Sequence, residues 1–209
     1  NNTTGALLFT NATFSNLVPL APFPPVVEAV ARSPTLGYAL AVGSYGMVVT
    51  SFDNGSTQNV SPPVRPYIQD ASWRDTGDLA LLVGFNGTVL LYNQTADRTT
   101  RIAPPDLNAS LRGVSWAPNG TEALIVGARV FWRFDLPTSN ISEPIGATTL
   151  DLYDVAYRPL RAEALAVGTG GFIGRWDGAN LSRVSSGSIG NSFLTLAWHR
   201  DAGGVGDYA

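Results

Sequence analysis

The chain has 209 residues, and 44% of them are hydrophobic, which is enough to bury a substantial core. Its net charge of −3 offers no basic surface to nucleic acid, and the absence of Cys excludes disulfides. No apolar run approaches the length needed to cross a bilayer, so we expect no membrane span in this piece. The 22 Gly and 14 Pro, without a long amphipathic pattern, favour an all-β fold with many turns.

Residues 1–25 are expected to form the end of a partial repeat unit. Gly5 precedes the next expected first strand, near Val26, by 21 residues, the interval that also separates Gly46 from Tyr67. The chain therefore begins at the third strand of a unit. A proline-rich connector that includes Pro24 follows, and it cannot belong to a central strand.

Four complete units are expected over residues 26–66, 67–107, 108–150 and 151–192. The last is the clearest, with apolar runs at 152–157, 164–167, 172–176 and 181–184 that are too short for helices. Turn residues, including Gly168 and Asp177-Gly178, separate these runs. Four antiparallel strands in about forty residues is the size of one propeller blade.

Three markers keep the same period along the chain. The glycine of a Val-Gly pair closes the second strand at Gly43, Gly84, Gly127 and Gly168, in steps of 41, 43 and 41 residues. An aromatic residue ends the first strand at Trp73, Trp116, Tyr157 and Trp198, and another aromatic, followed by a polar residue, ends the third strand. The repeat of about 42 residues predicts a β-propeller of four-stranded antiparallel blades.

Residues 193–209 are expected to start a further blade, which gives four full blades plus parts of one or two more in a single domain. In one interpretation, the strands at the two ends pair and close a five-bladed ring. In the other, these residues are an excerpt from a longer propeller or propeller array. The second is favoured, because the last expected strand stops after Tyr208-Ala209.

N-glycosylation sequons are far more frequent than composition predicts. Eleven of the thirteen Asn residues are followed by x-Ser/Thr, where roughly two would be expected. They are Asn1, Asn2, Asn11, Asn54, Asn59, Asn86, Asn93, Asn108, Asn119, Asn140 and Asn180. All of them fall outside the expected first and second strands, the doubly packed strands where a glycan would not fit. This distribution predicts an exported chain that carries covalent N-glycans.

Some units also match known propeller motifs. Residues 51–57, Ser-Phe-Asp-Asn-Gly-Ser-Thr, are similar to the Asp-box pattern S-x-D-x-G-x-T, and Trp176-Asp177 resembles the WD dipeptide. Residues 166–178 are similar to the AVG-x-x-G-x-I-x-x-Y-D-G repeats of extracellular propellers in bacteria and archaea. The chain thus resembles secreted β-propellers of the WD-repeat and Asp-box type. Dense sequons without disulfides further resemble archaeal surface glycoproteins such as S-layer or filament components. These motifs imply an architecture and not an activity.

Acidic and basic residues recur four positions apart around the first strands. The acids are Glu28, Asp70 and Asp154, and the bases are Arg32, Arg74 and Arg158. In a strand, residues four apart lie on one face, so we interpret them as an ionic ladder between neighbouring first strands around a channel. In the alternative, the arginines converge on an anionic ligand at the channel mouth, as those of sialidases do on a carboxylate. Helical ion pairs share the spacing, but Pro34, Pro118 and Pro159 interrupt such helices.

Other candidate residues have simpler interpretations. His199 is the only histidine, so a zinc centre or a Ser-His-Asp triad has little support, and we interpret it as a loop residue. Asp53 is a calcium ligand or, as we favour, the cap of its own hairpin turn. Four of the five Trp residues lie at repeat positions and are expected in the core, while Trp132 departs from the pattern. We expect no metal and no cofactor apart from the glycans.

The sequence therefore predicts a non-enzymatic, heavily N-glycosylated extracellular β-propeller. We expect it to be a structural or adhesive module of a cell-surface or filament assembly, whose partners are other surface or filament proteins, including copies of itself. The alternative is a carbohydrate-binding lectin or a sialidase-like glycosidase acting at the channel mouth. A lectin or glycosidase needs an open, sugar-free pocket with converging carboxylates or arginines, whereas a scaffold needs a filled channel and a bare contact surface.

Overall fold

A computed structural model describes residues 8–10, 17–19, 26–35, 37–46, 48–52, 57–59, 65–102, 104, 106, 108–143, 149–184, 190–200 and 207–208. For residues 8–10, 17–19, 51–52, 57–59, 199–200 and 207–208 it describes the backbone alone. The described residues form an all-β structure whose helical content is limited to two single turns of 3₁₀ helix. Within these ranges, none of the helices is long and apolar enough to cross a membrane.

Four sheets have four antiparallel strands each, paired in chain order. They are β3 (Val27–Arg32), β4 (Tyr38–Gly43), β5 (Val48–Phe52) and β6 (Thr57–Asn59) in the first sheet; β7 (Ile68–Trp73), β8 (Leu79–Gly84), β9 (Thr88–Asn93) and β10 (Arg98–Arg101) in the second; β11 (Leu111–Trp116), β12 (Glu122–Gly127), β13 (Val130–Asp135) and β14 (Asn140–Ser142) in the third; and β15 (Leu152–Tyr157), β16 (Ala164–Gly168), β17 (Ile173–Trp176) and β18 (Leu181–Arg183) in the fourth. The 3₁₀ turns are η1 (Ser44–Gly46) and η2 (Thr169–Gly171).

Two further sheets have two strands each. β1 (Leu8–Thr10) pairs with β2 (Leu17–Pro19), and β19 (His199–Arg200) pairs with β20 (Asp207–Tyr208), both antiparallel. The four apolar runs expected between residues 152 and 184 coincide with β15, β16, β17 and β18 to within one residue at each end.

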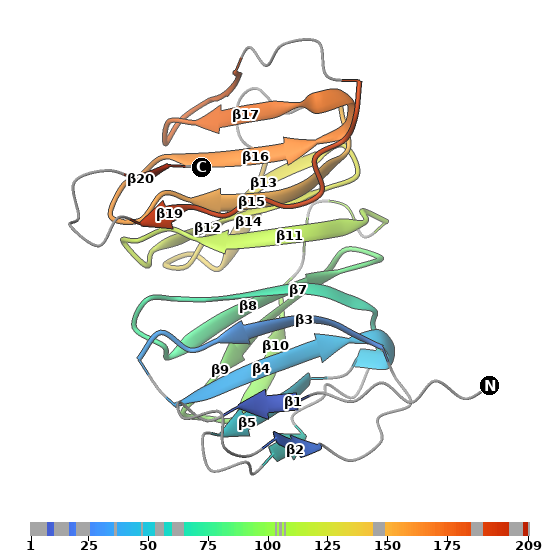
Figure 1. The fold of residues 1–209 in the computed structure, drawn as a ribbon, viewed down its shortest axis with the longest axis vertical. Helices are drawn as coiled ribbons and strands as arrows, with labels where there is room; N and C mark the ends of the chain where they lie inside the picture. Colours follow the sequence, from blue (N-terminus) through green and yellow to red (C-terminus); the bar gives the residue numbers. More distant parts are fainter. Residues whose placement is uncertain are drawn as a thin grey trace.

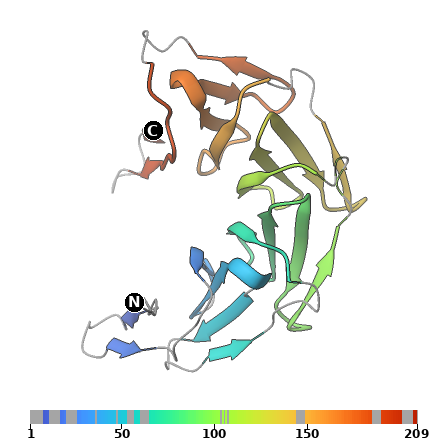
Figure 2. The same ribbon diagram turned by 90° about the vertical axis from the view of Figure 1, so that its right-hand side faces the viewer.

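The four large sheets follow one another in an arc, with their first strands on its inner side (Figures 1 and 2). The first strands of neighbouring sheets contact each other, β3 with β7, β7 with β11 and β11 with β15. The two small sheets lie at the two ends of the arc, and the six sheets do not close into a ring (Figure 2).

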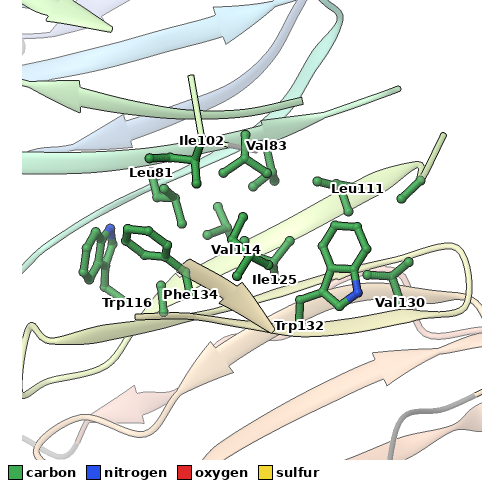
Figure 3. Packing of buried hydrophobic residues seen from close by; sticks show 14 residues of the cluster. Leu81, Val83, Ile102, Leu111, Val114, Trp116, Ile125, Val130, Trp132 and Phe134 are labelled. Atoms are coloured by element: carbon green, nitrogen blue, oxygen red, sulfur yellow. The ribbon is translucent and has the colours of Figure 1, made fainter. Parts of the chain in front are cut away.

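The hydrophobic core lies between the sheets. One cluster joins the first and second sheets, another the second and third, and another the third and fourth. In the middle cluster, Leu81 and Val83 of β8 face Val114, Ile125 and the aromatic side chains of the third sheet (Figure 3). Each sheet thus buries its apolar faces against its neighbours, which is why one unit cannot fold alone.

The recurring Val-Gly pair has a steric origin. An ideal Cβ on the glycine that ends the second strand would lie about 2 Å from the carbonyl oxygen just before the first strand. The distances are 1.9 Å at Gly43, 1.9 Å at Gly84, 2.1 Å at Gly127 and 2.2 Å at Gly168. This close approach accompanies a register shift in the first strand of each of the four large sheets, as between Ile68 and Asp70. The glycine is therefore needed wherever the bulged strand pair recurs.

That register shift places Glu28 differently from its sequence assignment. Ala29 pairs with Val42 in the first sheet, as Asp70 pairs with Val83 in the second. Ala29 therefore occupies the place of Asp70, and Glu28 is the bulged residue before it. A displacement of one residue turns a strand side chain toward the opposite face. Glu28 is therefore not a counterpart of Asp70 and Asp154, as the sequence spacing predicted.

Arg32 is displaced in the same way. It lies at the position of Trp73, which ends the first strand of the second sheet, and not at the position of Arg74. The first strand of this unit does not end in the aromatic residue that aligns the other units. Its pairing register matches theirs when the units are aligned on Gly43.

Candidate functional site: inner strands and sequon-bearing turns

Asp70 and Asp154 connect neighbouring sheets through backbone amides. Oδ2 of Asp70 accepts a hydrogen bond from the Val114 N–H in β11, at 2.9 Å. Oδ2 of Asp154 accepts one from the Leu196 N–H, at 2.8 Å, and another from the Thr195 hydroxyl, at 2.9 Å. The second oxygen of each carboxylate binds the N–H of the next residue in its own strand. The acids thus hold successive inner strands together, with amides in place of the arginines expected in an ionic ladder.

Two arginines of the expected ladder, Arg74 and Arg158, form ion pairs within their own sheets. Arg74 forms an ion pair with Asp78, with 3.0 Å between Nη1 and Oδ2, across the turn that follows β7. Arg158 pairs with Glu163 at 3.8 Å across the matching turn of the fourth sheet. Each pair bridges the turn between the first and second strands of its sheet.

Burial changes the chemistry of Asp70. It raises the pKa of the Asp70 carboxyl to about 7, although the two N–H donors favour its charged form. A carboxyl that titrates near neutral pH is suited to proton transfer, but both of its oxygens are already bound to backbone amides. The raised pKa of Asp70 therefore belongs to a structural link between sheets.

A second kind of hydrogen bond joins each first strand to the next sheet or segment, and its donor and acceptor depend on whether the accepting residue is Ala or Ser. Where the residue before the end of the first strand is Ala, its carbonyl accepts an indole N–H from the next sheet or segment: Trp73 Nε1 to Ala31 at 2.9 Å, and Trp198 Nε1 to Ala156 at 3.0 Å. Where it is Ser, its hydroxyl oxygen accepts a backbone N–H: Trp116 to Ser72 at 3.2 Å, and Tyr157 to Ser115 at 3.0 Å. The sequence repeat did not reveal this position as a contact between sheets, because it holds Ala in two units and Ser in two others and so shows no recurring residue type.

Residues 193–198 repeat the inner-strand relationships without belonging to a strand. Leu196 and Trp198 are bound to Asp154 and Ala156 as an inner strand would be, and the Phe193 N–H donates to the Gly168 carbonyl at 3.0 Å. The segment expected to open a further unit thus packs against the fourth sheet.

In the first and third sheets, the bulged residue of the first strand reaches the sheet that follows. Tyr67 directly precedes β7, and its hydroxyl donates a hydrogen bond to Glu28. At the matching place in the third and fourth sheets, Arg112 forms an ion pair with Asp151 at 3.3 Å, and its guanidinium lies 4.7 Å from the centre of the Tyr153 ring. Glu28 therefore connects two sheets, but from the bulge near the start of β3.

No known protein family model matches this chain. Among curated proteins, none is significantly similar to it in sequence.

Among the described residues, the sequon asparagines lie in turns and links or at the ends of third and fourth strands, and they are exposed wherever the side chain is described. These residues are Asn86, Asn93, Asn108, Asn119, Asn140 and Asn180. In the second, third and fourth sheets, a sequon lies at the turn between third and fourth strands. Asn119 lies at the same end of its sheet, whereas Asn86 and Asn108 lie at the opposite end. Of the other predicted sites, Asn59 ends β6 and only its backbone is described, and Asn1, Asn2, Asn11 and Asn54 lie outside the described residues.

Two of these asparagines have their amide nitrogen oriented for modification. Oδ1 of Asn93 accepts the Ala96 N–H and Oδ1 of Asn119 accepts the Thr121 N–H, both at 2.9 Å. These hydrogen bonds involve Oδ1 and do not involve Nδ2, which is the atom to which an N-linked sugar is attached.

The remaining candidates belong to the core or lie outside the described residues. Trp132, the one Trp that departs from the repeat, is 1% exposed and packs in the cluster between the second and third sheets, so it is not a sugar-stacking surface (Figure 3). His199 lies in β19 and not in a loop as predicted, and its side chain is not described; Asp53 lies outside the described residues. In the described ranges, no group of three or more His, Cys, Asp or Glu is placed to hold a metal ion.

Proposed function

We propose that this chain is a heavily N-glycosylated, extracellular β-propeller that serves as a structural or adhesive module of a cell-surface or filament assembly. The arc of four-stranded sheets, with inner strands joined by the same bonds from sheet to sheet, supports the propeller arrangement. Under this proposal each sheet is a blade, and the two small sheets are parts of further blades.

The observation that carries the proposal is the exposure of every sequon asparagine whose side chain is described. A glycan needs an exposed amide, and strands buried on both faces have no room for one. The sequons also avoid the first and second strands of all four sheets. Sugars on these turns would cover the edges of the blades and protect the backbone there from proteases.

Exposed apolar side chains at one end of the first sheet support the adhesive part of the proposal. At the end of the first sheet, Tyr45 is 69% exposed and Val26 is 59% exposed. The two are close neighbours, because the Val26 N–H donates to the Ser44 hydroxyl at 2.8 Å. Exposed apolar side chains of this kind are suited to contact with another protein.

Mass analysis of the protein from its own cells tests the proposal. We expect the intact mass to exceed that of the polypeptide by several glycans and to fall to the polypeptide mass after chemical deglycosylation. Glycopeptide mapping should place sugar on Asn93, Asn119, Asn140 and Asn180. A protein that leaves its cells without sugar, or remains inside them, would contradict the proposal.

A further inference from the structure

The turn between β8 and β9 shares its backbone form with the turns of the first and fourth sheets, where Tyr45-Gly46 and Gly170-Gly171 also have positive φ angles, but it differs from them in sequence. Asn86 and Gly87 have positive φ angles of 54° and 58°, and the Thr88 N–H donates to the Phe85 carbonyl at 3.2 Å, as in a tight type I′ hairpin turn. The matching tip residues are Tyr45, Arg129 and Gly170, none of which begins a sequon. The sequon therefore occurs in one of these four turns.

An aromatic residue occurs in that same turn. Phe85 precedes the sequon asparagine, whereas the matching positions in the other sheets hold Ser44, Ala128 and Thr169. Small residues suffice for packing at those three positions, so the fold does not require a ring at this place. Phe85 and the Asn86 sequon occur together in this turn and in none of the three matching turns, so an interaction between them would be specific to this turn.

The Phe85 ring is held in place and partly open. It stacks on Tyr67 with ring centroids 4.9 Å apart and an angle of 17° between the planes. Tyr67 is itself fixed through its hydroxyl, which donates to Glu28. Phe85 nevertheless remains 37% exposed. Tyr67 covers one face of the ring, and the exposed part of Phe85 is available for a second contact.

We propose that the open face of Phe85 is the binding surface for the first sugar of a glycan attached to Asn86. This inference rests on the proposed function, which makes Asn86 a glycosylated residue. A pyranose presents one face of C–H groups, and such a face packs on the electron-rich face of an aromatic ring. Asn86 adjoins Phe85 in the chain, so the sugar reaches the ring without spanning a gap.

The turn is prepared for this contact before any sugar is attached. Its backbone is fixed by the Thr88-to-Phe85 bond and by the Gly87 N–H, which donates to the Ala109 carbonyl of the link to the next sheet at 2.8 Å. A rigid attachment point and a rigid ring lower the ordering cost of the contact. The glycan would then stabilise this turn, in addition to its effect on solubility.

A double-mutant cycle on the glycosylated protein tests the inference. Phe85→Thr copies the residue of the fourth sheet, and Asn86→Asp removes the glycan while retaining a residue that tolerates positive φ. In the wild-type background, Asn86→Asp should lower Tm by about 2–4 °C, the shift typical of one modest contact in a chain of this size. In the Phe85→Thr background the same change should lower Tm by less than about 1 °C. Asn180→Asp, at a turn whose sequon has no aromatic residue directly before it, is the control and should show no dependence on Phe85.

A spectroscopic measurement and site mapping complete the test. The ring current of Phe85 should shift the C–H protons of the first sugar upfield, and Phe85→Thr should abolish that shift. Glycopeptide mapping separates the outcomes. An occupied Asn86 whose Tm effect and proton shifts are the same with and without Phe85 overturns this inference alone, as does an empty Asn86 on a chain glycosylated elsewhere. A chain without sugar at any site overturns the proposed function as well.

Discussion

A Cβ atom on Gly84 would lie 1.9 Å from the carbonyl oxygen of Tyr67. No side chain fits at that distance, so the β7–β8 pair must open or the Tyr67 peptide must turn. We expect Gly84→Ala to destabilise the protein by more than about 2 kcal/mol, measured by urea unfolding. Gly190, whose Cβ would meet nothing within 4 Å, is the matched control, and Gly190→Ala should change stability by less than about 0.5 kcal/mol. Equal effects of the two substitutions would disprove the steric explanation.

Asp70 should make stability depend on pH. Burial raises its pKa from 3.8 to about 7 in the folded chain. Between these values the folded state holds a proton that the unfolded state has released, so this group's contribution to stability falls as pH rises from about 4 to about 7. At ~1.4 kcal/mol per pKa unit, the loss is a few kcal/mol.

Two variants isolate that contribution in urea unfolding across pH 4–8. Relative to Asp70→Asn, which lacks the charge, the wild type should become less stable as pH rises through this window and then level off. Asp70→Ala should show the same pH-dependent difference at lower stability, because it also lacks an acceptor for the Val114 N–H. Parallel pH curves for wild type and Asp70→Asn would contradict the assignment.

The repeat could be predicted from sequence because steric and packing requirements recur in it. Gly84 is fixed by a close approach and recurs as Gly in all four large sheets, whereas the position of Trp116 is held by core packing and is aromatic in three of them. Glu28 was misplaced because the first unit lacks the aromatic residue that aligned the others. The hydrogen bonds between sheets could not be predicted. The partner of Asp70, for example, is a backbone N–H, which every residue except Pro has, so no residue type in the sequence indicates it.

The alternation of Ser and Ala on the inner strands leads to a comparison of two substitutions. Ser115→Ala leaves the Tyr157 N–H without its acceptor and should cost about 1–3 kcal/mol. Ser72→Ala removes the acceptor of the Trp116 N–H, but the buried Trp116 indole Nε1 has no partner among the described residues. In the variant this indole N–H is expected to donate to the carbonyl of residue 72, as Trp73 does to Ala31.

Ser72→Ala should therefore cost about 1 kcal/mol less than Ser115→Ala. Urea unfolding of the two variants measures the difference, and the near-ultraviolet circular dichroism of Ser72→Ala should report a changed Trp environment. A larger cost for Ser72→Ala than for Ser115→Ala would show that the indole does not replace the lost bond.

The six exposed sequon asparagines should differ in when they can be modified. An N-glycosylation sequon is recognised through its Ser or Thr as well as its Asn. The Thr88 hydroxyl of the Asn86 sequon is buried and donates to the Phe85 carbonyl at 2.7 Å, whereas Thr95 and Thr121, of the Asn93 and Asn119 sequons, are exposed. Asn86 is thus expected to require modification before β8 and β9 pair.

Treatment of the folded, sugar-free protein with a purified oligosaccharyltransferase and its lipid-linked donor measures this difference. Glycopeptide mapping should find sugar on Asn93 and Asn119 with little on Asn86, and the same enzyme acting on urea-unfolded chain should modify all three. Because Thr88 lies in a sheet between two core clusters, opening it means unpairing β8 and β9, so modification of Asn86 in the folded protein should rise only near the unfolding transition. Equal modification of the three sites in the folded protein at low temperature would show that the buried hydroxyl does not limit access.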